Sequence, residues 1–191
     1  MSQPSDSEIQ TASEILKRLD PGYLPRELFF QFTRLSTTAI LEIVPLRLNG
    51  HRVEVMFFTR PENDPIWAGK LHTPGAVIMP TDVNQKTRGF DKVAAIILDE
   101  EMGLSLDNFK KQTGRDLVYS ETLLHYPLRG AELANVFYID LTNIQLGARE
   151  GLWLDSNKLP ARTVDTQIYF IQKSVNLFRQ NLQTQNKSML N

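Results

Sequence analysis

The sequence predicts an α/β protein, in which helices pack against a β-sheet. Two apolar runs flank Asn49-Gly50, a dipeptide that is the strongest short-range signal for a β-hairpin. A third apolar run, at 132–141, has the character of a strand, and the segment 90–102 carries apolar residues at helical spacing. Helices and strands that each have an apolar face bury it by stacking in layers around one core.

The composition fits one globular domain over residues 1–191. With 41% hydrophobic and 23% charged residues, the chain can form a sizeable core. The formal net charge of −1 gives no reason to expect nucleic acid or an anionic membrane as a partner. The chain has no cysteine, which excludes disulfides, thiolate catalysis and cysteine-bound zinc. The polar start and the lack of an apolar run of about 18 residues lead us to expect a cytoplasmic protein.

Two helices are expected ahead of the sheet, in an extension over residues 5–35. Ser5 and Glu8 have the spacing of a capping box, and apolar residues then recur at helical spacing until Pro21-Gly22. The segment 26–35 is expected to form a second helix. Its apolar residues are too dense for free exposure, so we expect this helix to pack on the sheet.

The hairpin comes next, with strands expected at 37–48 and 51–60. The helix predicted over 90–102 then ends in an acidic pair, Glu100 and Glu101. Glu101 lies one turn beyond Ile97 on the same edge of this helix. The apolar face of the helix consists of Phe90, Val93, Ala94, Ile97, Leu98 and Met102.

A further helix is expected in a C-terminal extension over 164–183. Its apolar residues alternate three and four apart and form a narrow stripe made of Ile168, Ile171, Val175, Phe178 and Leu182. This stripe is expected to pack on its own domain. Pairing with another copy, as a homodimer, is the alternative.

The segment that contains the acidic pair is the most informative part of the chain. From Leu98 to Leu104 the sequence LDEEMGL fits the pattern hydrophobic-any-Glu-Glu-any-Gly-hydrophobic at every position. A Pro74-Gly75 turn precedes it, and five residues separate Ala76 from Asp82. The segment resembles a Nudix box, which reads Gly, five residues, Glu, seven residues, Arg-Glu and then the pattern above.

The resemblance departs from the family pattern in the middle of the box. Ala76 and Asp82 stand where the family has Gly and Glu, and Ile96 and Ile97 occupy the Arg and Glu positions. Thirteen residues instead of seven separate Asp82 from Ile96, which we interpret as a longer loop before the helix. Ile97 lacks the carboxylate that a general base needs.

The resemblance covers residues 36–160 and implies an α/β/α sandwich with a mixed β-sheet. It also implies that the chain hydrolyses a nucleoside diphosphate linked to another group, such as a nucleotide sugar. Mg²⁺ or Mn²⁺ would be the cofactor, because these ions prefer oxygen ligands. The implied site residues are Glu101 and Glu150 for catalysis, Glu100, Glu101 and Asp82 for the metal, and Gly75, Ala76 and Arg129 for the substrate.

Two other functions stay open at this point. A Nudix fold that has lost Arg and Glu from its box would bind a nucleotide or related ligand without catalysis. Alternatively, the added helices would make the protein a scaffold for association. We expect His72 to be a hydrogen-bonded loop histidine, and Trp67 and Trp153 to be packing anchors.

Overall fold

The sheet of this protein is mixed, as expected. The computed structural model describes residues 3–21, 23–82, 90–128, 130–146, 149 and 151–188, without the side chains of 185–188. The strands lie in the order β3-β2-β1-β6-β5, with β4 paired to β1 and β7 paired to β2. Of these pairs, β1 with β6 is parallel, and the others are antiparallel. The strands are β1 (Thr38–Asn49), β2 (Arg52–Thr59), β3 (Leu71–His72), β4 (Gly75–Val77), β5 (Val118–His125), β6 (Glu132–Asp140) and β7 (Leu152–Asp155).

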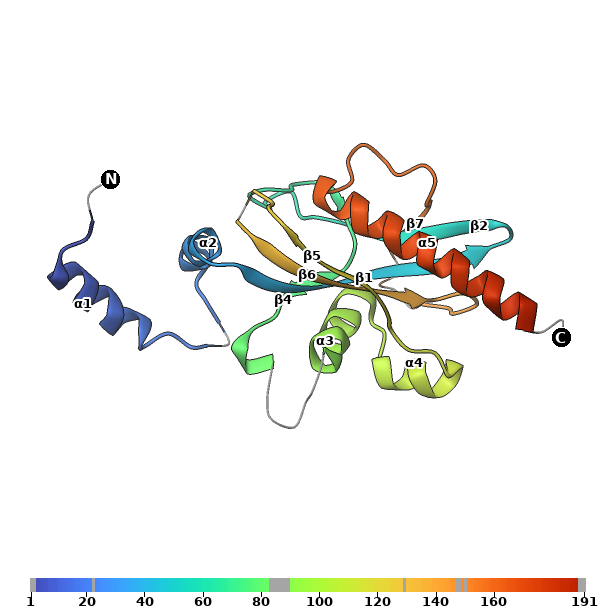
Figure 1. Ribbon diagram of the computed structural model, residues 1–191, viewed down its shortest axis with the longest axis horizontal. Coiled ribbons are helices and arrows are strands. Elements are labelled where there is room, and N and C mark those ends of the chain that lie inside the picture. Colours follow the sequence, from blue (N-terminus) through green and yellow to red (C-terminus); the bar gives the residue numbers. More distant parts are fainter. Residues whose placement is uncertain are drawn as a thin grey trace.

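Helices cover both faces of the sheet, which gives the expected α/β/α sandwich (Figure 1). Helix α5 (Asp165–Ser188) lies on one face. Helix α3 (Asp91–Met102) and helix α4 (Leu106–Thr113) lie on the other. Each layer has its own apolar core, one under α5 and one under α3. None of the helices in the described part of the chain is long and apolar enough to span a membrane.

Strand β1 contributes to both cores because its side chains alternate between the two faces of the sheet. Ile40 and Val44 face the core under α5, and Leu41 and Ile43 face the core under α3. The predicted hairpin is confirmed, since β1 and β2 are joined at Gly50, whose φ is +59°. Glycine adopts this left-handed conformation without steric cost.

The predicted box helix is confirmed as α3, and Gly103 ends it. Gly103 has a φ of +64°, and its N–H donates to the carbonyl of Asp99. The next N–H, of Leu104, donates to the carbonyl of Leu98 over 3.0 Å. These two hydrogen bonds satisfy the carbonyls of Asp99 and Leu98, and the left-handed Gly103 forms an αL type of helix cap. The glycine of the box therefore stops the helix directly after Glu101 and Met102.

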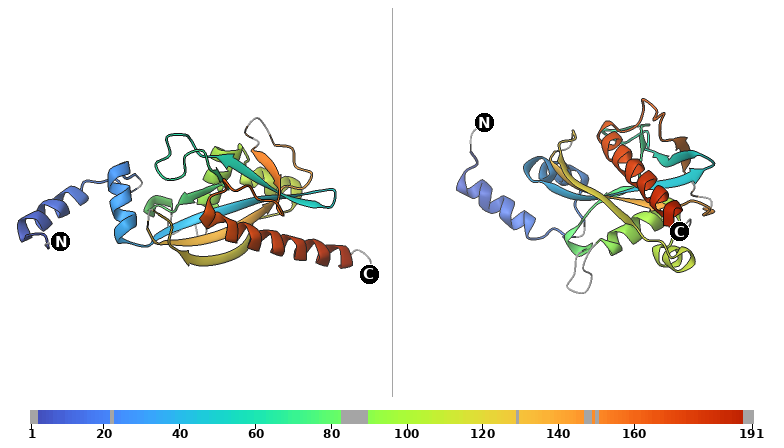
Figure 2. Two further views of the ribbon diagram at one scale, coloured as in Figure 1. Left: turned by 90° about the horizontal axis from the view of Figure 1, so that it is seen from above. Right: turned by 45° about the vertical axis from the view of Figure 1, so that its right-hand side comes forward.

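The terminal helices differ in how they pack. The stripe on α5 packs within the chain, with Ile171, Val175 and Phe178 buried in the core under α5. Helix α1 (Asp6–Leu16) has the predicted capping box at Ser5. The expectation that α2 (Arg26–Leu35) packs on the sheet is wrong: it buries only Thr33 and lies beyond the end of the sheet, where β1 begins (Figures 1 and 2).

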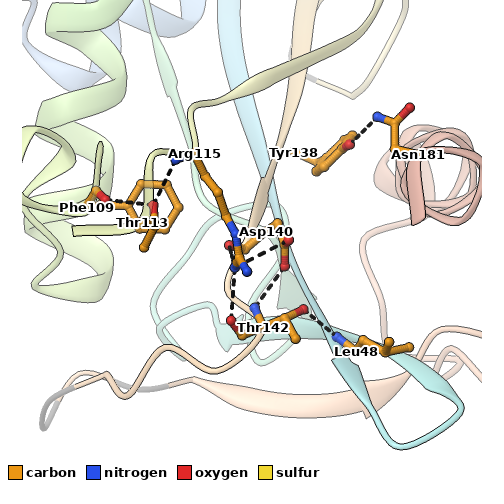
Figure 3. A network of polar contacts seen from close by, with 8 residues as sticks. All are labelled: Leu48, Phe109, Thr113, Arg115, Tyr138, Asp140, Thr142 and Asn181. Atoms are coloured by element: carbon orange, nitrogen blue, oxygen red, sulfur yellow. Dashed lines mark hydrogen bonds and ion pairs between the residues drawn. The ribbon is translucent and has the colours of Figure 1, made fainter. Parts of the chain in front are cut away.

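Helix α4 and strand β5 were not expected from the sequence. A network of polar contacts connects the end of α4, through Thr113 and Arg115, to the end of β6 (Figure 3). The guanidinium of Arg115, between α4 and β5, donates to the carbonyl of Thr142 over 2.9 Å and to that of Asp140 over 3.2 Å. On the α5 side, the Asn181 amide donates to the Tyr138 hydroxyl over 2.6 Å. These contacts fix the end of β6, from which the chain continues toward Arg149.

Candidate functional site

The acidic pair lies on the last turn of α3. The side chain of Glu100 is exposed, and that of Glu101 is half-buried. Burial raises the pKa of Glu101, the positive charge of Arg60 lowers it, and the negative charge of Glu100 raises it, with a net upward shift. Glu101 therefore lies in a poorly solvated position with one cation and one anion for neighbours.

Arg60 is the cation of this site. It directly follows β2, and the carbon of its guanidinium lies 5.7 Å from the centre of the Trp67 ring, in a cation–π contact. Its Nε is buried and has no hydrogen-bond partner among the described residues. The charge of Arg60 also acts on His72 and Asp64. Arg60 is thus a half-buried arginine with one donor unused.

The loop between β2 and β3 places Trp67 against Arg60. The carboxylate of Asp64 accepts hydrogen bonds from the backbone N–H groups of Ile66 at 2.9 Å and Trp67 at 2.8 Å. Burial raises the pKa of Asp64, but these two hydrogen bonds and the charge of Arg60 outweigh it, so that the pKa falls below its usual value. The ionised carboxylate therefore stabilises the turn that carries Trp67.

His72 is a buried, neutral histidine beside Arg60. It lies on β3 with 4% of its surface exposed, and its Nδ1 is 2.9 Å from the carbonyl oxygen of Thr73. Because a carbonyl only accepts, Nδ1 carries the proton and donates. Burial, followed by the charge of Arg60, lowers the pKa of His72 to about 4. The expectation of a hydrogen-bonded histidine holds, although His72 lies in a strand and not in a loop.

Arg149 attaches the loop after β6 to the end of α3. Its guanidinium donates to the carbonyls of Asp99 and Glu100, each over 3.0 Å. These are among the last carbonyls of the helix, where a positive charge also complements the helix dipole. The residue before Glu150 in the sequence is therefore bound directly behind the acidic pair.

Gly75 lies against a buried carboxylate. A Cβ added to Gly75 would lie 2.6 Å from Oε2 of Glu42, a β1 residue with 7% of its surface exposed. Gln167 of α5 donates to that oxygen over 3.0 Å and accepts from the N–H of Thr73 over 2.9 Å. Packing against Glu42 is thus sufficient to require a glycine at position 75.

The structure does not place the remaining predicted site residues together with the acidic pair. Ala76 is half-buried on β4, opposite Leu41, and packs against the core under α3. Asp82 accepts from the N–H of Met79 and pairs with Lys92 over 3.5 Å, in the first turn of α3. Lys92 and Glu101 are nine positions apart, so about 14 Å of helix separates the lysine that Asp82 pairs with from Glu101. Arg129 and Glu150 lie outside the described residues.

The two isoleucines of the box occupy different environments. Ile97 is 3% exposed and belongs to the core under α3, whereas Ile96 is 38% exposed. The position that carries a carboxylate in the family pattern therefore holds an apolar side chain that is part of the core, one turn before Glu101.

The described residues do not by themselves fit the metal ion that the resemblance implies. Within the described ranges, no group of three or more His, Asp or Glu side chains is placed to hold a metal. Glu100 and Glu101 supply two carboxylates, and Ile97 supplies none. The positive charge of Arg60, which acts on Glu101, would repel a metal ion bound to that carboxylate.

Sequence reasoning missed three contributors to the site and its support. Arg60 is the last residue of the strand expected at 51–60, and neither its position nor that of Arg149 matches a motif that predicts a role in the site. Glu42 carried a signal that was overlooked, because a carboxylate in the middle of an apolar strand needs a buried polar partner. No sequence pattern identifies Gln167 as that partner, since 125 residues separate the two.

This protein resembles known proteins in structure but not in sequence. No protein-family model matches the sequence, and no curated protein matches it. The structure is similar to the Nudix domain of Shewanella oneidensis NrtR complexed with ADP ribose, with a TM-score of 0.57, 12% identity, and 87% of this chain and 97% of that chain covered. It is also similar to Caenorhabditis elegans Ap4A hydrolase, with a TM-score of 0.51, 13% identity, and 75% and 98% covered.

A third similar structure is S. oneidensis NrtR complexed with a 27mer DNA, with a TM-score of 0.53, 14% identity, and 74% of this chain and 62% of that chain covered. The expectation of no nucleic-acid partner therefore stays a prediction. At such identities a likeness shows the fold alone.

The sheet order, the box segment on α3 and these matches together identify this chain as a protein with the Nudix fold.

Proposed function

We propose that this chain is a binding module for a nucleoside diphosphate derivative, held beside Arg60 and Glu101, and that it does not hydrolyse its ligand. The observation that carries the proposal is the half-buried Arg60, whose buried Nε has no hydrogen-bond partner among the described residues. A buried donor without an acceptor is unfavourable, so its presence calls for an acceptor that binds there. Phosphate oxygens match the fork of the guanidinium.

The neighbours of Arg60 fit such a ligand. The Trp67 ring, in contact with the guanidinium, offers an aromatic face close to where phosphate would bind. The names of the similar structures, an ADP-ribose complex and an Ap4A hydrolase, supply the ligand class. ADP-ribose is accordingly the first probe.

Two features favour binding over hydrolysis. The side chain at position 97 is apolar and lies in the core under α3, so it offers no carboxylate to a metal or a water molecule. The positive charge of Arg60 acts on Glu101, and like charge opposes a divalent cation at the same carboxylate. An arginine beside Glu101 compensates the ligand's negative charge without a metal.

The test is calorimetric titration with ADP-ribose of the unmodified protein and of Arg60→Gln. Losing a hydrogen bond between charged groups costs about 1.5–3 kcal/mol, so affinity is expected to fall roughly 10- to 100-fold. Arg52→Gln is the matched control, because Arg52 is an exposed arginine at the start of β2, the strand that Arg60 follows. Equal affinities of Arg60→Gln and the unmodified protein, or no binding by either, would contradict the proposal.

A metal-dependent Nudix hydrolase is the second candidate, and the position of Arg149 favours it. Arg149 binds the carbonyls of Asp99 and Glu100 and is followed in the sequence by Glu150. In this candidate, Glu100, Glu101 and Asp82 would hold Mg²⁺ or Mn²⁺ and Glu150 would act in catalysis, as the sequence predicts.

A panel of nucleotide sugars, ADP-ribose, dinucleoside polyphosphates and nucleoside triphosphates, assayed with and without Mg²⁺ or Mn²⁺, separates the two candidates. Metal-dependent turnover that falls at least roughly 100-fold in Glu101→Gln would establish the hydrolase in place of the binding module. Ligand binding by a protein without turnover on the panel supports the binding module.

A further inference from the structure

The loop between β2 and β3 is closed by hydrogen bonds between its two ends. The N–H of Arg60 donates to the carbonyl of Lys70 over 2.9 Å, and the N–H of Gly69 donates to the carbonyl of Arg60 over 3.2 Å. Gly69 has a φ of +66°, which glycine adopts without steric cost. Both backbone groups of Arg60 are therefore fixed by the far end of the loop that carries Trp67.

Asp64 fixes the part of this loop that leads into Trp67. One oxygen of its carboxylate, Oδ1, accepts from the backbone N–H groups of both Ile66 and Trp67. The N–H of Asp64 itself donates to the carbonyl of Pro61 over 2.9 Å. An aspartate that accepts from N–H groups two and three residues later forms a turn around its own side chain. Asp64 therefore sets the backbone position from which the Trp67 ring extends.

Helix α2 holds the same loop from outside. Arg26, the first residue of α2, donates to the carbonyl of Asn63 over 3.4 Å. The positive charges of Arg60 and Arg26 both act on the half-buried carboxylate of Asp64. These charges favour the ionised carboxylate, which is the stronger acceptor for N–H groups. Helix α2, which does not pack on the sheet, thus supports the loop that carries Trp67.

We propose that Asp64 is a positioning residue for ligand binding, which holds Trp67 against the guanidinium of Arg60 before the ligand arrives. The inference rests on the proposed function, because the ligand concerned is the one that Arg60 binds. The carbon of the guanidinium lies 5.7 Å from the centre of the Trp67 ring. An arginine side chain has a large rotamer entropy, so a guanidinium that is already fixed on a ring loses less entropy when the ligand binds.

The first test is calorimetric titration with ADP-ribose of the unmodified protein, Asp64→Ala and Asp64→Asn. Asp64→Ala is expected to lower the affinity about 10-fold, the lower end of the effect of losing a hydrogen bond to a charged group. Asp64→Asn keeps an acceptor for both N–H groups and is expected to stay within about threefold of the unmodified protein. Unchanged affinity of Asp64→Ala, or an equal loss in both variants, would overturn the proposal.

Asp155→Ala is the matched control for this titration. The carboxylate of Asp155 also accepts from a backbone N–H two residues later, that of Asn157, over 2.9 Å. Asp155 pairs with Glu54 on β2, which is six positions and so about 20 Å of extended chain from Arg60. Its affinity for ADP-ribose is expected to equal that of the unmodified protein. A loss as large as that of Asp64→Ala would overturn a specific role of Asp64.

The second test repeats Asp64→Ala in the Arg60→Gln background. Because Asp64 acts through the guanidinium of Arg60, the double variant is expected to bind ADP-ribose no more weakly than Arg60→Gln alone. A residue that only stabilises the fold would lower the affinity by the same factor in both backgrounds, and that result would overturn the proposal.

The third test measures the position of Trp67 without a ligand. Trp153 is the other tryptophan of the chain, so Trp153→Phe leaves Trp67 as the single source of tryptophan fluorescence. In this background Asp64→Ala is expected to raise the quenching of Trp67 by acrylamide, because the ring leaves the guanidinium, and Asp64→Asn is expected to leave the quenching unchanged.

The quenching result distinguishes failure of this inference from failure of the proposed function. Unchanged quenching in Asp64→Ala would overturn the positioning role of Asp64, even where the unmodified protein binds ADP-ribose. An unmodified protein that does not bind ADP-ribose would contradict the proposed function, and with it the ligand-binding role of Asp64, even where the quenching rises.

Discussion

Replacing Gly75 by alanine tests whether this glycine serves packing. The backbone of Gly75 is not in the left-handed region, so alanine is compatible with its conformation. The added Cβ would lie 2.6 Å from Oε2 and 2.9 Å from Oε1 of Glu42. Because Glu42 is 7% exposed and accepts a hydrogen bond from Gln167, its carboxylate has no easy way to move.

The expected loss of unfolding free energy in Gly75→Ala is the sum of three contributions. Overpacking of a buried site costs about 1–3 kcal/mol, and a weakened hydrogen bond to a charged group costs part of about 1.5–3 kcal/mol. In the opposite direction, alanine stabilises the protein by about 0.4–1 kcal/mol, because it lowers the conformational entropy of the unfolded chain. The net loss of unfolding free energy is about 2 kcal/mol, which for a chain of this size lowers the melting temperature by about 4–8 °C.

Urea unfolding at pH 7 of Gly75→Ala, Glu42→Ala and the double variant measures this coupling. In the Glu42→Ala background the clashing oxygens are gone, so Gly75→Ala is expected to cost little. If Gly75→Ala is as stable as the unmodified protein, or costs the same in both backgrounds, packing against Glu42 does not explain the glycine. A role in ligand binding would then be the better explanation.

Three further predictions concern the same region. Ile97→Glu is expected to lower the unfolding free energy by about 3 kcal/mol or more, because it buries a carboxylate. The control Ile96→Glu changes the exposed neighbouring residue and is expected to cost under about 0.5 kcal/mol. Urea unfolding measures both losses, and similar values would contradict the assignment of Ile97 to the core. Arg149→Ala, which removes hydrogen bonds to the last carbonyls of α3, is expected to cost about 1 kcal/mol in the same assay, and the exposed Arg52→Ala is its control. His72 has a folded-state pKa of about 4, below its ordinary value of 6.5, so the stability it contributes is present above pH 6.5 and is lost as the pH falls toward 4. NMR titration is expected to place its midpoint near 4, and a midpoint near 6.5 would show that His72 is solvated.

The sequence predicted those elements whose signals are local. Asn49-Gly50 marked the hairpin, the Ser5 capping box marked α1, and LDEEMGL marked the end of α3. Helix α4 was missed although Ser105 and Gly114 cap its two ends. The placement of α2 was wrong because dense apolar residues show that a helix tends to be buried, without showing against which surface.

The sequence by itself determined the α/β class, the box segment and the loss of a carboxylate at position 97, because each depends on residue type and spacing. Only the tertiary structure decided that Glu101 has Arg60 for a neighbour, that Arg149 binds the end of α3, and that Gly75 faces Glu42 and Gln167. These contacts join residues up to 125 positions apart. Their partners are selected by strand order and helix packing, which bring distant segments together and which no local pattern encodes.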